Sequence, residues 1–271
     1  MLLPLPPALA ERYASWDGVA APTRDAATIV LLREGTDGPE TYLLRRQSSM
    51  AFAPGMYVFP GGGLQDSDRD PLPWHGPDPA WWGERLGCDE ATARGLVVAA
   101  VRETFEESGI LFAGPDGDTV VGDTAHLQDA RPLLDAGEVA FGDFLDEHGL
   151  VLRADLVGAW SHWITPAFEP RRYDTRFFVA AVPRGQVVGS LPGEADRGGW
   201  YPLRAVLAAV RGGEAAMLPP TWITCSELAD VAVVDALTTA AARVVTPIEP
   251  RLVEVDGEHF LENPIEEVPR G

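Results

Sequence analysis

The chain contains no lysine, so arginine supplies all 21 of its basic residues, against 41 acidic residues. The formal net charge is −20 at pH 7. A surface this acidic repels the phosphate backbone of nucleic acids and does not attract polyanions over long distances. We therefore expect no nucleic-acid partner, and any phosphate group must be bound locally, by arginine side chains or by a metal ion.

Cysteine, histidine and long apolar runs are also scarce. The two cysteines, Cys88 and Cys225, and the five histidines form no zinc or redox motif. Residues 1–10 have no positively charged start and are interrupted by three prolines, so we expect no export signal. No apolar stretch reaches the 18 or so residues that a membrane span needs. The sequence thus predicts a cytoplasmic protein with reduced thiols and no membrane contact.

The length of 271 residues allows a sizeable core, and no Gly/Ser-rich linker or internal repeat divides the chain. We expect a single domain over 1–248, followed by an acidic tail over 249–271 whose last residues lack regular structure. Hydrophobic patterning predicts strands at 26–32, 41–45, 157–164, 175–182 and 199–202, and helices at 94–108, 139–148, 203–211 and 221–243. This alternation is typical of an α/β fold.

The segment 102–110 places three glutamates, Glu103, Glu106 and Glu107, at spacings i, i+3 and i+4 in a predicted amphipathic helix that ends at Gly109. At 3.6 residues per turn the three carboxylates share one face of the helix. Like charges at this spacing cost an isolated helix a few tenths of a kcal/mol per pair unless a cation neutralises them. The cluster is therefore either an ordinary solvated acidic face or a site for a hard metal ion.

A run of three glycines lies upstream of this helix, where the apolar segment 58–60 ends. Together with 102–110 it resembles the Nudix hydrolase signature, G-x5-E-x7-R-E-U-x-E-E-x-G-U, in which U is a bulky aliphatic residue. Gly62 matches the first glycine, and Asp68 stands where the family usually has glutamate. Thr104 replaces an aliphatic residue, although its methyl group can still pack in a half-buried position.

The two halves of the signature are separated by 33 residues, between Asp68 and Arg102, instead of seven, so the box contains a 26-residue insertion at about 69–93. Its prolines and tryptophans predict an ordered excursion with a short helix near its end. An insertion at this place occurs in one Nudix branch, which resembles the peroxisomal-type acyl-coenzyme A diphosphatases. The similarity of this chain to that branch extends over about residues 25–240. We expect the insertion to lie beside the active site, shaping either the substrate pocket or the contact of a homodimer.

This resemblance implies a Nudix-type α/β/α sandwich with a mixed β-sheet, the box insertion and an extra C-terminal helix. It also implies hydrolysis of a phosphoanhydride with the help of Mg²⁺ or Mn²⁺, ions that prefer oxygen ligands. The implied ligands are Glu103, Glu106, Glu107 and the carbonyl of Gly61. Arg102 is implied to orient a box glutamate through an ion pair.

The identity of the general base is left open, because members of the family use either a box residue or a residue of a later loop. Glu107 is one candidate and Glu194 is the other, since the segment 193–200 resembles the loop that carries an acidic residue before a tryptophan-bearing strand. The alternative for Glu194 is an exposed turn residue. Glu169 is a weaker loop candidate.

The substrate-binding residues are also predictions with simple structural alternatives. Guanidinium groups are suited to phosphate, but they can equally form surface ion pairs. The candidates for phosphate binding are Arg45, Arg46, Arg171 and Arg172. Trp160 and Trp163 can stack on an adenine, yet residues three apart in a strand face opposite sides, so we expect at least one of them in the core.

Three functions remain open from the sequence. The first is hydrolysis of coenzyme A or acyl-coenzyme A, a small-molecule nucleotide substrate. The second is the same chemistry on NADH, ADP-ribose or a sugar nucleotide. The third is a non-hydrolytic nucleotide-binding module, against which the intact glutamates weigh, because a binder has no need of the cluster.

Overall fold

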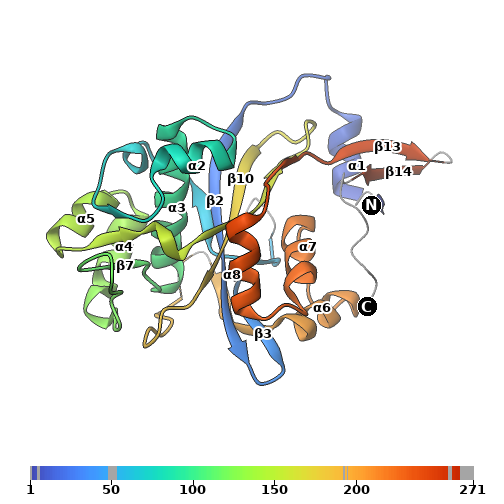
Figure 1. Ribbon diagram of the computed structural model, residues 1–271. Helices are drawn as coiled ribbons and strands as arrows, with labels where there is room; N and C mark the ends of the chain where they lie inside the picture. Colours follow the sequence, from blue (N-terminus) through green and yellow to red (C-terminus); the bar gives the residue numbers. More distant parts are fainter. Residues whose placement is uncertain are drawn as a thin grey trace.

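The computed structural model describes residues 2–4, 7–47, 54–191, 193, 195–255 and 258–262. Its centre is a mixed sheet (Figure 1) whose strands lie in the order β11 (Ala195–Pro202), β3 (Gly38–Arg46), β2 (Thr23–Gly35), β10 (Arg172–Ala181), β9 (Gly158–Ile164) and β12 (Pro247–Ile248). β10 runs parallel to β2 and antiparallel to β9. Two short strands, β4 (Tyr57–Val58) and β5 (Gly61–Gly63), join this sheet at β3 and β2.

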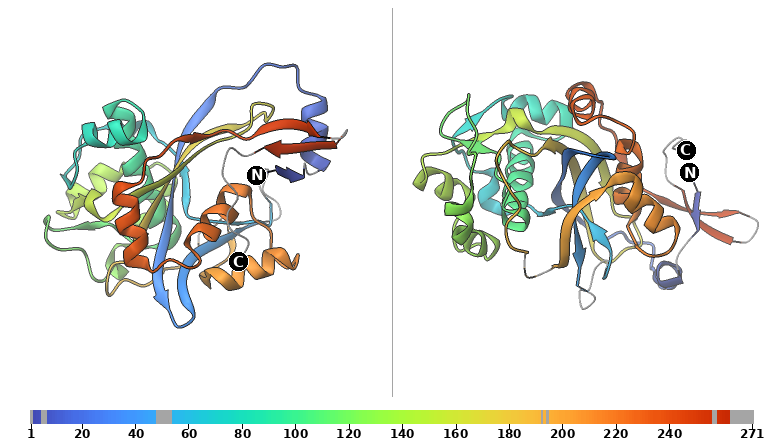
Figure 2. Two further views of the ribbon diagram at one scale, coloured as in Figure 1. Left: turned by 45° about the vertical axis from the view of Figure 1, so that its right-hand side comes forward. Right: turned by 90° about the horizontal axis from the view of Figure 1, so that it is seen from below.

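Both faces of the sheet are covered by helices, as Figures 1 and 2 show. Side chains alternate along β2, so Ile29 and Leu31 pack in the core beneath α3 (Glu90–Ser108). Val30 and Leu32 belong to the second core, which they share with α6 (Leu203–Arg211), α7 (Pro219–Leu228) and α8 (Val233–Ala242). The predicted α/β/α sandwich with a mixed sheet is confirmed.

Helix α3 has clear sequence signals at both ends. The Asp89 side chain accepts a hydrogen bond from the Thr92 amide, and this N-cap starts the helix at Glu90, four residues before the predicted start. Gly109 takes the left-handed conformation (φ 77°) that ends it. Thr104 is fully buried, and its hydroxyl donates to the carbonyl of Ala100.

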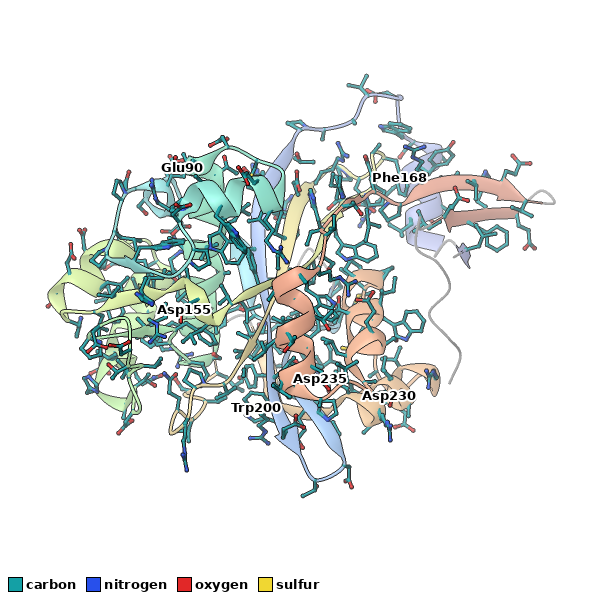
Figure 3. All side chains as sticks on the ribbon, in the orientation of Figure 1. Glu90, Asp155, Phe168, Trp200, Asp230 and Asp235 are labelled. Carbon is teal, nitrogen blue, oxygen red and sulfur yellow. The ribbon has the colours of Figure 1, made fainter. Side chains whose placement is uncertain are left out.

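The predicted strands coincide with observed strands apart from their end residues, but the single helix predicted over 221–243 is wrong. The chain bends after Leu228, near Asp230 in Figure 3, and forms two helices, α7 and α8. The Val233 amide, at the start of α8, donates to the Glu34 side chain of β2. This long-range cap fixes a new helix start, which lets α8 pack against β9 and β10 while α7 packs on α6.

The box insertion is ordered. It follows η1 (Asp66–Arg69) and contains β6 (Trp74–His75) and the expected short helix, α2 (Pro79–Leu86). β6 pairs with β8 (Val151–Arg153), which also pairs with β7 (Ala113–Gly114). Helix α2 packs against α3, and its Trp82 is buried against Phe178 of β10. The insertion is thus part of the main core, and its role in a pocket or a homodimer stays a prediction.

Three short helices complete the layer around α3, namely η2 (Ala125–Ala130), α4 (Arg131–Asp135) and α5 (Phe141–Glu147). α5 matches the helix predicted over 139–148. No helix in the described ranges is long and apolar enough to cross a membrane. The cytoplasmic location stays a prediction.

Described segments near the two ends of the chain form an unexpected small sheet. β1 (Leu2–Pro4) pairs with β14 (Glu258–Glu262), which forms a hairpin with β13 (Arg251–Val255). Helix α1 (Pro7–Ala14) lies beside this hairpin (Figure 1), and its Tyr13 packs edge-on against Phe168, labelled in Figure 3. Part of the segment predicted as a tail therefore has regular structure.

Candidate active site

The glycine run pairs with β2 at the central sheet and lies against α3. Val58 of β4 pairs with Leu44 of β3, whereas Gly61 of β5 pairs with Thr28 of β2. The segment 57–63 therefore crosses from β3 to β2 on the side where α3 packs. This crossing brings the backbone of the glycine run to the glutamates of the helix.

Arg102 is buried, with 1% of its side chain exposed, and it holds three carboxylates. Its Nε and Nη2 donate to the two oxygens of Asp68, each at 3.0 Å. Its Nη1 donates to Glu103 and to Glu106, both at 2.9 Å, and Nη2 also reaches the carbonyl of Gly63. We call Arg102, Asp68, Glu103 and Glu106 the Arg102 cluster.

The Arg102 cluster carries more negative charge than its single guanidinium can balance. Burial raises the pKa of Glu103 to about 7, although the charge of Arg102 opposes the shift. Burial also raises the pKa of Glu106. The pKa of Arg102 lies above its usual range, because its carboxylate partners outweigh the effect of burial. A cation added at this cluster relieves the repulsion among the carboxylates.

The glycine backbone packs directly on two box glutamates. The Gly61 amide donates to Oε2 of Glu107 at 2.8 Å. A Cβ atom at Gly62 would lie 2.4 Å from Oε1 of Glu103, a distance that no side chain tolerates without displacing the carboxylate. A larger residue at 62 would therefore move the Glu103 carboxylate away from Arg102.

The donor chemistry of these residues fits a divalent metal ion such as Mg²⁺ or Mn²⁺. The site offers carboxylate and backbone carbonyl oxygens together with unbalanced negative charge. Within the described ranges, however, no three Asp, Glu, His or Cys side chains converge as a ligand set. Glu103 and Glu106 turn towards Arg102, and Glu107 turns towards the Gly61 amide. The assignment of Gly61, Glu103, Glu106 and Glu107 as ligands stays a prediction.

The three candidate bases have different surroundings. Glu194 lies outside the described residues, between Gly193 and the start of β11. Glu169 is buried and forms an ion pair with Arg12 at 2.6 Å, so its carboxylate is already occupied. Glu107 is partly exposed and lies against the glycine run, which makes it the described candidate nearest to the box.

The predicted phosphate-binding arginines do not form one group of free cations. Arg45 makes a two-point ion pair with Asp196, at 2.7 and 2.6 Å. Arg172 donates to Glu249 and to two backbone carbonyls, so it joins β10 to the C-terminal segment. Arg46 ends β3 and hydrogen-bonds through its backbone to Gly55 and Met56. Arg171 is exposed, and no described residue forms an ion pair with it.

Trp160 and Trp163 are both in the second core, with 3% and 4% of their surfaces exposed. The prediction that they face opposite sides is wrong, because the pairing of β9 with β10 has a β-bulge between Phe177 and Phe178, opposite Trp160. Arg243 covers the Trp160 ring at 4.2 Å. Neither indole ring presents an open face to a nucleotide base.

Arg131 is a buried site residue that sequence reasoning missed. It begins α4 and donates through Nε and Nη2 to the carbonyl of Glu106, at 3.0 and 2.8 Å. Its charge also faces Glu107 and Tyr42. No local pattern marks this arginine, because its partners are a backbone atom 25 residues away and a loop near 190.

Gly62→Ala should lower turnover by about tenfold or more, because its Cβ displaces Glu103 from its contact with Arg102. Gly63→Ala is the matched control, since the nearest atom to its Cβ is a carbonyl oxygen 3.9 Å away. Steady-state kinetics of the two purified variants, with their melting temperatures, tests this expectation. Equal turnover in the two variants would contradict the close approach at Gly62.

Comparison with known proteins places this site in context. The family model described as the NUDT19 Nudix domain matches residues 85–227, more than half of the chain, including all of α3. A Caenorhabditis elegans protein named as a nudix hydrolase is 28% identical over 245 residues, which cover 90% of this chain and 73% of that protein. The acyl-coenzyme A diphosphatase NUDT19 of Xenopus laevis is 23% identical over 76% of this chain.

The chain spans less than two thirds of the length of the vertebrate relatives, 63% of the Xenopus laevis protein and 55% of the Gallus gallus NUDT19. Among solved structures, the crystal structure of a NUDIX hydrolase from Alicyclobacillus acidocaldarius is similar with a TM-score of 0.62 and 28% sequence identity. The similarity covers 82% of this chain and 98% of that one. The shared fold therefore extends well beyond the box.

Proposed function

The chain belongs to the Nudix hydrolase superfamily, in the branch of the NUDT19 acyl-coenzyme A diphosphatases, and we propose that it hydrolyses the phosphoanhydride bond of coenzyme A or an acyl-coenzyme A. Nudix hydrolases generally use divalent metal ions, and we extend this requirement to the chain. The observation that carries the proposal is the Arg102 cluster against the glycine run. Its buried, unbalanced carboxylates suit cation-assisted attack on a phosphate.

The side chains divide the work of this reaction. When bound, a divalent ion neutralises the phosphate oxygens and polarises phosphorus. Arg102 fixes the rotamers of Glu103 and Glu106, and the Gly61 amide orients Glu107. A base, Glu107 or Glu194, accepts a proton from the attacking water as the new P–O bond forms and the bond to the bridging oxygen breaks. The products are 3′,5′-ADP and a 4′-phosphopantetheine derivative.

A second candidate is the same hydrolysis on a nucleotide without a 3′-phosphate, such as NADH, ADP-ribose or a sugar nucleotide. The observation that favours it is the pairing of Arg45 with Asp196 and of Arg172 with Glu249. Two of the four candidate cations are thus already neutralised. Of the other two, Arg171 is exposed and forms no ion pair with a described residue.

Dephospho-coenzyme A should be a poorer substrate than coenzyme A by about tenfold to a hundredfold, the value of one charge-assisted hydrogen bond. Arg171→Gln or Arg46→Gln should erase this difference in kcat/KM. Arg204→Gln is the control. Arg204 is exposed and pairs with Asp230, and its helix, α6, covers the face of the sheet opposite to α3. A panel of coenzyme A, acyl-coenzyme A, NADH and ADP-ribose, assayed with Mg²⁺ and with Mn²⁺, measures the preference. Faster cleavage of NADH or ADP-ribose, with no effect of the 3′-phosphate, would favour the second candidate.

A further inference from the structure

The C-terminal end of α3 is fastened by groups from outside the helix. A helix leaves its last four carbonyls without partners of its own. Here the carbonyl of Glu106 accepts both Nε and Nη2 of Arg131, and the carbonyl of Ser108 accepts the amide of Gly189 at 2.8 Å. The carbonyl of Gly109 accepts the hydroxyl of Thr124 at 2.9 Å. The turn that carries Glu106 and Glu107 is therefore held from several directions.

Arg131 also binds the loop that leads to β11. Its Nη2 donates to the carbonyl of Ser190 at 2.9 Å, and its Nη1 donates to Oε1 of Gln128 at 2.9 Å. The residue is 5% exposed. Arg131 forms no ion pair with a carboxylate of the described residues. Its guanidinium instead donates to two backbone carbonyls and to the Gln128 side chain. We call the contacts of Arg131 with Glu106 and Ser190 the Arg131 bridge.

On the loop side of the Arg131 bridge, the backbone of Gly189 packs closely against two side chains. A Cβ atom at Gly189 would lie 2.3 Å from Oε1 of Gln128 and 2.6 Å from Nη1 of Arg131. The loop backbone thus lies directly on the guanidinium and its amide partner. Four residues beyond Ser190 comes Glu194, and β11 then pairs with Arg45 and Arg46 of β3.

We propose that Arg131 is a positioning residue of the hydrolase, which holds the Glu106–Glu107 turn of α3 in register with the loop 189–191. The Arg131 bridge joins the turn that carries Glu107, a candidate base, to the described loop that precedes β11. Its loss lets the turn and the loop move independently, and misplacement by about 1 Å is enough to cost up to a hundredfold in rate. The inference rests on the proposed function, because its kinetic consequence is read from the hydrolysis.

The matched control is Arg153, another buried arginine with a comparable set of hydrogen bonds. Arg153 is 7% exposed and donates to both oxygens of Asp155 and to the carbonyl of Thr119. Asp155, labelled in Figure 3, lies in the layer of short strands around β8. Arg153→Met removes similar contacts from a part of the chain that carries no proposed site residue.

We expect Arg131→Met to lower kcat by about tenfold to a hundredfold with a smaller change in KM, on whichever nucleoside diphosphate derivative the wild-type protein cleaves. Arg153→Met should keep kcat near wild type at a temperature well below both melting points. Arg131→Lys keeps the positive charge but cannot bridge both carbonyls with the same fork, so it should restore only part of the loss. Gly189→Ala, which retains Arg131, should also lower kcat.

Hydrogen exchange of the same variants supplies a readout independent of activity. In Arg131→Met the amides of 106–109 and 189–191 should exchange faster together, whereas Arg153→Met should leave both segments unchanged. Equal kcat losses in the two methionine variants, full activity of Arg131→Lys, or unchanged exchange in both segments would overturn the inference. If wild-type protein cleaves no member of the panel, the proposed function fails, and the exchange result still decides whether Arg131 couples the two segments.

Discussion

Glu106→Gln and Glu107→Gln should each lower turnover at least about a hundredfold while the fold remains intact. Glutamine keeps the size of the side chain but removes the charge that stabilises a bound cation, and that loss costs several kcal/mol in the transition state. Glu106 keeps an oxygen that can accept from Arg102, and Glu107 keeps one for the Gly61 amide. Activity measured over a Mg²⁺ and Mn²⁺ titration, with circular dichroism of each variant, tests the expectation.

Glu90→Gln provides the control for this experiment on the same helix. Glu90 lies in the first turn of α3, is exposed and pairs with Arg94 four residues later, so its loss should change turnover by less than about twofold. Turnover near wild type in both box variants at saturating metal would refute the ligand assignment. A large loss in only one of them would move the ligand role to the other carboxylates of the Arg102 cluster.

The sequence predicts the local features of this fold well, because its signals are local. Glycine at 109 ends α3, alternating apolar residues mark β2, and the motif residues place the glutamates on one helix face. The predicted helix ends are wrong where a residue distant in the sequence determines where a helix starts. The split between α7 and α8 depends on a cap from Glu34, almost 200 residues away in the chain.

The candidate site divides along the same line. The contact between Arg102 and Glu106 follows from their i, i+4 spacing on one helix, whereas the pairing of Arg102 with Asp68 across the insertion is not predicted by the sequence. Arg172 and Trp160 were ambiguous, because their partners come from the far end of the chain, in Glu249 and Arg243. Arg131 carries no motif at all, since it recognises backbone carbonyls, which every residue has.

Arg102→Met should give the largest loss of stability of any single arginine substitution, about 3–5 kcal/mol. Methionine fills much of the space but leaves Asp68, Glu103 and Glu106 buried without their cation. The carbonyl of Gly63 also loses its donor. The partner charges remain in a desolvated site, and breaking a buried pair in this way costs more than the pair contributes when intact.

The loss is measured by thermal and urea unfolding in the presence of a chelator, so that metal binding does not compensate for the missing charge. A loss of 3–5 kcal/mol corresponds to a melting temperature lower by roughly 6–20 °C for a protein of this size. Arg204→Met is the control, because its ion pair with Asp230 is about 70% exposed on both sides and should contribute at most about 1 kcal/mol. Unfolding of Arg102→Met at the same urea concentration as Arg204→Met would contradict this expectation. It would mean that the buried charges of the Arg102 cluster do not hold α3 to η1.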